Sequence, residues 1–202
     1  MIKNIIFDLG NVLLRFSAEE FLDYVDVHGR DRKILMNEVF RSPEWAMMDR
    51  GSIDEDEAYE AMIRFIPEHL HKKAESLVKS WYKMTGNVEG MTEVVKTLKE
   101  NGYGIYLLSN ANFAIHKYWD SLPYARYFDG MIASCDYLLV KPQNEIYHLF
   151  ESVYDLKLDE CLFIDDSCAN VEGAIHNGME GIVFHNDVED LIKKLRYKGI
   201  NI

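Results

Sequence analysis

Five short apolar runs recur along the chain, and each is continuous rather than alternating with polar residues. They span residues 5–7, 105–108, 131–133, 162–164 and 182–184. Continuous runs of this length are typical of strands that are covered by helices, because neither face of such a strand meets water. The pattern therefore predicts five strands of a parallel sheet.

Helical periodicity fills the stretches between these runs, and Gly102 and Gly178 stand where two of the helical patterns stop. The patterns span residues 91–100, 113–119, 143–154, 169–177 and 188–197. Strands that alternate with helices at this spacing predict an α/β fold with a doubly wound parallel sheet.

One long segment, residues 17–85, interrupts the alternation because it contains no strand pattern. Several helix starts lie in it, as two capping-box pairs and one serine before proline: Ser17 with Glu20, Ser52 with Glu55, and Ser42 with Pro43. We therefore expect a core domain formed by residues 1–16 and 86–202, and an inserted α-helical cap domain formed by residues 17–85. An insertion directly after the first strand lies over the carboxyl ends of the strands, where open α/β sheets bind ligands. It is interpreted equally well as a lid or as a second helical layer.

Composition narrows the class of protein further. The 202 residues are 48% hydrophobic and 28% charged, as in an ordinary globular protein, and their net charge is -12. A negative field of this size disfavours nucleic acid and gives no basic patch for a membrane surface, so an anionic ligand needs local positive groups or a cation. Three cysteines without a CxxC pair favour neither a disulfide framework nor a zinc site. Without a signal-peptide pattern or an apolar stretch of about 20 residues, we expect a cytoplasmic protein.

Polar residues that suit catalysis follow the predicted strands. They are Asp8, Ser109, Asn110, Lys141, Asp165 and Asp166. Taken singly, each has an ordinary explanation, such as a turn, a helix cap or a solvated lysine. Taken together, a parallel sheet brings three carboxylates to one edge, which makes an oxygen cage suited to Mg²⁺. Ser109 and Lys141 then face that cage, and a hydroxyl, an ammonium and a divalent ion are the groups that hold a phosphate dianion against a carboxylate.

Four motifs resemble those of the haloacid dehalogenase superfamily in order, spacing and strand context: "FDLGNVLL", "LLSNAN", "KP" and "FIDDSCANVEGA". The similarity covers the chain from residue 2 to about residue 184. Within the superfamily, the Asp-Leu-Gly-Asn form of the first motif resembles a subgroup that includes bacterial phosphatases of glucose 1-phosphate. We expect five strands in the order 3-2-1-4-5, and residues 17–85 occupy the place of the cap in that branch.

The resemblance implies a role for each motif residue. Asp8 is implied to be the nucleophile, which attacks phosphorus and forms an aspartyl-phosphate that water then cleaves. The implied Mg²⁺ ligands are Asp8, the backbone carbonyl of Gly10 and Asp166. Asp165 is implied to be either a further ligand or a residue that supports the ligands. Asn170 is implied to orient that shell. The phosphoryl oxygens are implied to bind Ser109, Asn110 and Lys141, and Lys141 also keeps Asp8 ionised.

The chain departs from the superfamily pattern at Gly10. Most of its phosphatases carry an aspartate there, which protonates the leaving oxygen and then activates water, a contribution of about 10²- to 10⁴-fold in rate. Three explanations stay open. The leaving group needs little protonation, as in a sugar 1-phosphate or an aryl phosphate; a cap residue such as Glu44, Asp49 or His28 replaces the acid; or the protein is slow or purely binding.

We therefore expect a Mg²⁺-dependent phosphomonoester hydrolase that acts on a small metabolite phosphate, with a sugar phosphate as the expected substrate. The alternatives are a metal-independent 2-haloacid dehalogenase, whose class also lacks the second acid of the first motif, and a non-catalytic metabolite-binding protein. The adjacent Asp165 and Asp166 argue against the dehalogenase, because this pair has an obvious task only where a cation is held. Nothing in the sequence indicates an oligomeric state.

Overall fold

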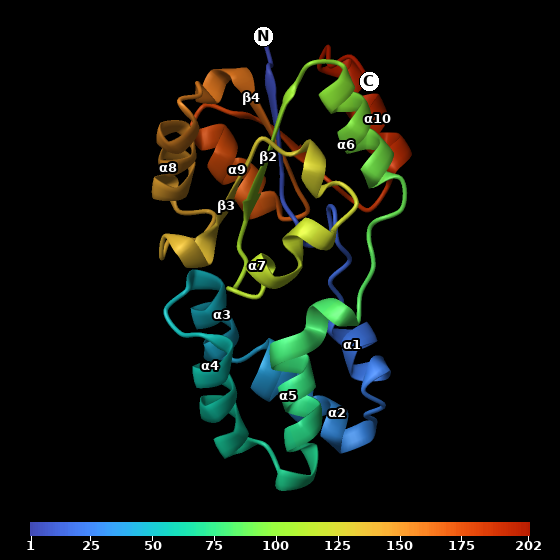
Figure 1. The fold of residues 1–202 in the computed structure, drawn as a ribbon, viewed down its shortest axis with the longest axis vertical. Helices are drawn as coiled ribbons and strands as arrows, with labels where there is room; N and C mark the ends of the chain where they lie inside the picture. Colours follow the sequence, from blue (N-terminus) through green and yellow to red (C-terminus); the bar gives the residue numbers. More distant parts are fainter.

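The computed structural model describes residues 1–202, and it forms two lobes that follow one another along the long axis (Figure 1). The upper lobe in Figure 1 contains the sheet, the helices around it and both chain ends. The lower lobe contains α1 to α5 and no strand. The motif residues Asp8, Ser109 and Asp166 lie at the end of the sheet that faces the lower lobe.

The sheet has five strands, all parallel, in the order β3-β2-β1-β4-β5, so the predicted fold class and strand order are confirmed. The strands are β1 (Asn4–Phe7), β2 (Gly104–Ser109), β3 (Gly130–Ala133), β4 (Cys161–Asp165) and β5 (Glu180–Val183). Phe7 of the central strand pairs with Leu107 on one side and Ile164 on the other. This register places Asp8 beside the ends of β2 and β4.

Helices cover both faces of the sheet, as continuous apolar strands require. On one face lie α6 (Met91–Glu100) and α10 (Val188–Tyr197), and on the other lie α8 (Asn144–Tyr154) and α9 (Cys168–His176) (Figure 1). Successive residues of β1 alternate between the two faces, with Ile5 and Phe7 in one apolar cluster and Ile6 in the other. The sheet therefore has a separate core on each side.

The lower lobe is built from α1 (Ala18–Tyr24), α2 (Gly29–Leu35), α3 (Pro43–Arg50), α4 (Glu55–Met62) and α5 (His71–Ser80). Ser17 and Ser42 cap α1 and α3 as predicted, each accepting a backbone hydrogen bond. The capping box predicted at Ser52 is wrong. The box that caps α4 lies two residues later, where Asp54 and Glu57 each accept the other's backbone N–H.

The two lobes meet at two short segments that follow strands of the sheet. The first is α7 (Ile115–Tyr118), shorter than predicted because the chain turns into a 3₁₀ helix at Trp119. The second is η7 (Ser134–Asp136), a single 3₁₀ turn directly after β3, against which α3 packs. Apolar residues of the lower lobe join the same buried cluster as one face of the sheet, so the two lobes share a core.

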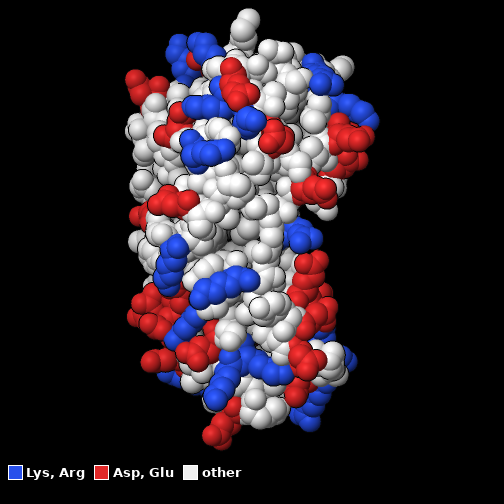
Figure 2. Space-filling view, turned by 45° about the vertical axis from the view of Figure 1, so that its right-hand side comes forward, with Lys and Arg blue, Asp and Glu red and all other residues white.

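No helix of the structure is both long and apolar enough to pass through a membrane. Acidic and basic side chains are interspersed over both lobes on the face shown in Figure 2. This face therefore has neither a continuous acidic nor a continuous basic surface.

Candidate active site

A cavity of ≈ 180 Å³ opens between the lobes, at the carboxyl ends of the central strands. The sheet supplies its polar floor, which includes Asp8, Ser109 and Asp166. The helical lobe supplies the opposite wall, which includes Trp45 and Asp49 of α3. Open α/β sheets bind ligands at this position, so the cavity is the candidate active site.

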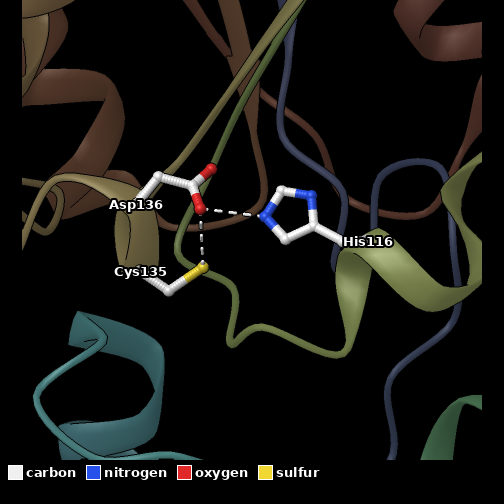
Figure 3. Close-up of side chains that lie close together, drawn as sticks. All are labelled: His116, Cys135 and Asp136. Carbon is white, nitrogen blue, oxygen red and sulfur yellow. Dashed lines mark hydrogen bonds and ion pairs between the residues drawn. The ribbon is translucent and has the colours of Figure 1, made fainter.

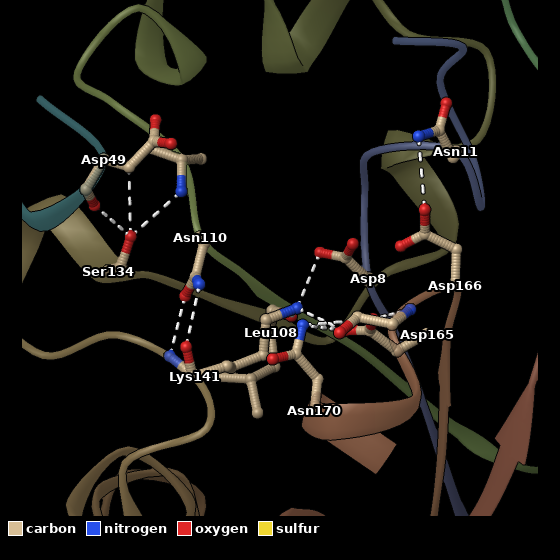
Figure 4. A network of polar contacts seen from close by, with 12 residues as sticks. Asp8, Asn11, Asp49, Leu108, Asn110, Ser134, Lys141, Asp165, Asp166 and Asn170 are labelled. Carbon is tan, nitrogen blue, oxygen red and sulfur yellow. Dashed lines mark hydrogen bonds and ion pairs between the residues drawn. The ribbon is translucent and has the colours of Figure 1, made fainter. Parts of the chain in front are cut away.

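Lys141 forms a buried ion triplet with two of the predicted acids (Figure 4). Its Nζ lies 2.8 Å from Oδ1 of Asp8 and 2.6 Å from Oδ2 of Asp165, and its side chain is only 1% exposed. The Lys141 ammonium also donates to the carbonyl oxygen of Leu108 at 2.9 Å. The ammonium thus donates hydrogen bonds to Asp165 and to the Leu108 carbonyl, and Asp8 adds a second negative charge at ion-pair distance, which balances a buried charge.

Asn110 holds the backbone of Lys141 in place. Its side-chain oxygen accepts from the Lys141 N–H at 2.8 Å, and its amide nitrogen donates to the Lys141 carbonyl at 3.1 Å. Asn110 was predicted as a phosphate-binding residue, but the structure shows that both ends of its side-chain amide bind this loop. The residue lines the cavity, and its backbone N–H, like those of Leu9 and Gly10, donates to no acceptor in the protein.

The two adjacent aspartates differ in their surroundings. Asp165 is fully buried, and its oxygens accept from the Ser167 N–H at 2.7 Å and from the Asn170 amide at 3.1 Å, in addition to Lys141. Asp166 is exposed toward the cavity and accepts only from the Asn11 amide, at 3.2 Å. Successive residues at a strand end point in opposite directions, which explains why one carboxylate is saturated and the other is open.

The ionisation of these groups follows from burial and charge. Burial raises the pKa of Asp8 to about 6, although Lys141 opposes the shift, and Asp165 adds to it. Burial alone would lower the pKa of Lys141, but the two carboxylates together hold it above its usual value. Burial also raises the pKa of Asp166. Near neutral pH, the floor therefore carries one ammonium among three carboxyl groups.

This floor fits an added divalent cation. Single oxygens of Asp8, Asp165 and Asp166 all lie within 4.8 Å of one another, so one lysine is left to balance three acids. Oδ1 of Asp8 is buried and, although paired with Lys141 by charge, accepts no hydrogen bond of regular geometry. Carboxylate and carbonyl oxygens are the ligands that Mg²⁺ prefers.

Aromatic side chains form most of the wall opposite the floor. Phe16, Trp45, Trp81 and Tyr118 line the cavity, and the indole N–H of Trp81 is buried without a partner. The sequence patterns that marked the floor gave no sign of Trp81 or Tyr118, since rings at helical spacing are ordinary core residues. Asn11 and Ser134 were missed as well, although Asn11 stands inside the Asp-Leu-Gly-Asn motif.

Of the three cap residues considered as a replacement acid, the structure brings only Asp49 to the cavity. His28 is exposed and pairs with Asp26 at 2.9 Å. Glu44 lies at the start of α3, about 140° around the helix from Asp49 at 100° per residue. Neither His28 nor Glu44 lines the cavity.

A second group of titratable residues lies outside this cavity, on the segments α7 and η7 where the two lobes meet (Figure 3). His116 of α7 and Cys135 of η7 both contact Oδ1 of Asp136, at 2.9 Å and 3.8 Å. Burial and the neighbouring Asp136 raise the pKa of the Cys135 thiol to about 12. The thiol is therefore protonated near neutral pH, and the cluster is accounted for by the contact between His116 and Asp136, which joins α7 to η7.

The match to known proteins agrees with this arrangement. A family model described as haloacid dehalogenase-like hydrolase matches residues 2–178. The chain therefore belongs to the haloacid dehalogenase-like hydrolases, as its four motifs predicted, and it is a hydrolase.

Two relatives carry names that describe phosphate hydrolysis. A flavin mononucleotide hydrolase of Arabidopsis thaliana is 30% identical over 160 residues, which are 78% of this chain and 63% of the relative. The chain thus spans about three fifths of that protein's length. A sesquiterpene phosphatase of Aspergillus oryzae is 27% identical over 89% of this chain and 88% of its own.

Solved structures show the same fold. A predicted HAD-like hydrolase from Porphyromonas gingivalis aligns with a TM-score of 0.73 at 24% identity, covering 97% of this chain and 98% of that chain. A HAD-family enzyme from Bacteroides thetaiotaomicron, solved with magnesium and inorganic phosphate, aligns with a TM-score of 0.75 at 21% identity, covering 95% and 99%. L-2-haloacid dehalogenase from Xanthobacter autotrophicus also aligns, with a TM-score of 0.67 at 18% identity, covering 98% and 84%.

Proposed function

We propose that the chain is a Mg²⁺-dependent phosphomonoester hydrolase that uses Asp8 as its nucleophile. The observation that carries this proposal is the floor of the cavity, where one carboxylate, one buried ammonium and several free backbone donors converge. Asp8 attacks phosphorus, and the alcohol leaves. Water then cleaves the aspartyl-phosphate and releases inorganic phosphate, so that one displacement is divided into two easier ones.

Lys141 has two tasks in this proposal. It keeps Asp8 ionised despite the burial that raises its pKa, and it balances the charge of the incoming phosphate. The Asp165 carboxylate binds the Lys141 ammonium, and the Asn110 side chain binds the Lys141 backbone. Asp165 and Asn170 are accordingly positioning residues, which hold the lysine and orient the acid pair.

The phosphoryl oxygens bind Ser109 and the free backbone N–H groups of Leu9, Gly10 and Asn110. Ser109 ends β2 beside Asp8, and all four residues line the cavity. Backbone donors that are already fixed by the fold need no rearrangement as charge develops in the transition state.

Asp8, the Gly10 carbonyl and Asp166 are the groups that hold Mg²⁺ in this proposal, because Asp165 is saturated by protein donors. When bound, the ion neutralises the phosphate and favours in-line attack by a carboxylate that would otherwise repel it. Asn11 fixes the Asp166 carboxylate through its amide.

The substrate that we propose is a small sugar phosphate. Aromatic rings make flat walls for the faces of a sugar ring, and the unpartnered Trp81 N–H is a donor for a hydroxyl. The volume of ≈ 180 Å³ is close to that of an apolar cavity of about 150 Å³ that holds benzene, so a group with a single ring fits. The same walls favour an aryl phosphate as a second candidate.

A panel of metabolite and aryl phosphates tests the function, with released phosphate measured in Mg²⁺ and in chelator. We expect turnover of ring-bearing monoesters in Mg²⁺, and loss of turnover in chelator and in Asp8→Asn. Halide release from a 2-haloacid without metal would instead establish the dehalogenase alternative. No phosphate release from any ester would refute the proposal.

A further inference from the structure

In the proposed mechanism the floor of the cavity has no acid left for the leaving oxygen, because Asp8 is the nucleophile and Asp166 holds Mg²⁺. Gly10 has no side chain, although a Cβ there would meet nothing within 4 Å. The Lys141 ammonium already contacts Asp8, Asp165 and the Leu108 carbonyl. An alkoxide leaves slowly without protonation, so a donor has to come from the opposite wall.

Asp49 is the carboxyl group of that wall. It lies in the last turn of α3 and lines the cavity together with Asp8, so the two acids approach from different lobes (Figure 4). Trp45, one helical turn earlier, lines the same cavity, because residues four apart share a face of a helix. This face of α3 is therefore directed at the phosphate site.

The end of α3 is fixed to the core rather than free to swing. Ser134 of η7 donates to the backbone carbonyl of Asp49 and accepts from the Ala111 N–H at 2.9 Å. Gly51, with φ 83°, ends the helix so close to η7 that a Cβ would lie 2.1 Å from the Cys135 carbonyl oxygen. The backbone of Asp49 is thereby held at a set position against the core.

The surroundings of Asp49 also suit a proton donor. The ion pairs of the site join Lys141 to Asp8 and Asp165, and none includes Asp49. Burial raises the pKa of Asp49 to about 7, with the Trp45 indole opposing and Asp8 adding to the shift. The other titratable groups that face it are Tyr118 of α7 and Cys135 of η7, both with raised pKa values and both neutral near pH 7.

We propose that Asp49 is the general acid and base of this enzyme, in place of the aspartate that Gly10 lacks. This inference rests on the proposed phosphatase function. As the Asp8 oxygen bonds to phosphorus and the ester P–O bond breaks, the Asp49 proton passes to the leaving oxygen. The Asp49 carboxylate then takes a proton from water, whose oxygen attacks phosphorus, and the Asp8–phosphate bond breaks. Asp49 is protonated again when inorganic phosphate leaves.

Rates in the wild-type enzyme test this first, without any variant. Single-turnover release of phenols from aryl phosphates, from 2,4-dinitrophenyl to phenyl, measures how the rate depends on the basicity of the leaving group. A general acid makes this dependence shallow, and the phosphorylation rate then falls as the pH rises above about 7, where Asp49 loses its proton. A steep dependence with no such limb would overturn the proposal.

Asp49→Asn then assigns the acid. We expect phenyl phosphate to lose about 10²- to 10⁴-fold in phosphorylation rate and 2,4-dinitrophenyl phosphate to lose far less, because only the poorer leaving group needs a proton. The matched control is Glu44→Gln, on the same helix but outside the cavity, which leaves both rates unchanged. Gly10→Asp added to Asp49→Asn restores the phenyl phosphate rate, since the space beyond Gly10 is open.

The outcomes separate this inference from the function on which it rests. If Asp49→Asn keeps the wild-type dependence on the leaving group while Asp8→Asn is inactive, Asp49 is not the acid and the phosphatase proposal stands. If the wild-type protein releases phosphate from no ester, both proposals fail.

Discussion

The ion triplet around Lys141 gives the sharpest prediction about stability. Lys141→Met keeps the length of the side chain but leaves Asp8 and Asp165 facing each other without their cation. Removing one partner of a buried ion pair costs about 3–5 kcal/mol, because the remaining charge stays buried. For a chain of this size each kcal/mol lowers the melting temperature by about 2–4 °C, so we expect a decrease of about 6–20 °C.

The loss depends on pH, and its sign follows from the raised pKa of Asp8. Its folded value of about 6 lies above the unfolded value of 3.8, so its protonation favours the folded state at low pH. Without Lys141 this pKa rises further. The deficit of Lys141→Met is therefore smallest near pH 4 and grows as the pH rises through 6 and beyond.

The assay is thermal unfolding in chelator at a series of pH values, so that no divalent cation replaces the ammonium. Lys194→Met is the matched control, because its pair with Asp190 at 2.7 Å joins two exposed side chains and is worth at most about 1 kcal/mol. A Lys141→Met protein that melts within a degree or two of the control, or whose deficit is the same at every pH, would refute this account of the triplet.

Three further changes have defined outcomes. Gly51→Ala forces a Cβ into a backbone carbonyl of η7 at positive φ, so we expect a loss of more than about 1 kcal/mol in thermal unfolding and a lower kcat. Asn110→Ala removes both hydrogen bonds that hold the Lys141 backbone; unfolding in urea should show a loss of about 1–3 kcal/mol, and kcat/KM should fall. Asn170→Ala frees the Asp165 oxygens, and calorimetric titration should show Mg²⁺ affinity about 10- to 100-fold weaker; an unchanged affinity would show that Asn170 does not orient the acids.

Most of the sheet was predictable because its signal is local. Each apolar run of the sequence became a strand, and the helix predicted for residues 188–197 ends where it was expected. Strand β5 begins two residues earlier than predicted, at Glu180. It forms the edge of the sheet, where a strand tolerates polar residues, so its apolar run is shorter than the strand itself.

The floor of the site was predictable for a related reason. Asp8, Ser109 and Asp165 end their strands or follow them directly, and parallel strands bring their carboxyl ends to one edge. The sequence could not show which of the two adjacent aspartates is bound by protein donors and which is open to the cavity. Whether Asp165 or Asp166 is saturated depends on which way each side chain points at the strand end, and that depends on contacts with Lys141 and Asn11.

The sequence offered Glu44, Asp49 and His28 as acids from the helical lobe but could not choose among them, because the choice depends on how that lobe docks. Asp49 reaches the cavity only because η7, which is 85 residues further along the chain, binds the carbonyl of Asp49 and fits against Gly51. The misplaced capping box has a simpler origin. Both Ser52 and Asp54 precede a glutamate by three residues, and the chain uses the second pair.

The most direct test of the central claim is the covalent state of Asp8 during turnover. The enzyme is mixed with an aryl phosphate and Mg²⁺, quenched in acid, digested and analysed by mass spectrometry. We predict a phosphoryl group on the peptide that contains Asp8, present in Mg²⁺ and absent both in chelator and in Asp8→Asn. Steady turnover without this adduct, retained when Asp8 is replaced by asparagine, would contradict the account.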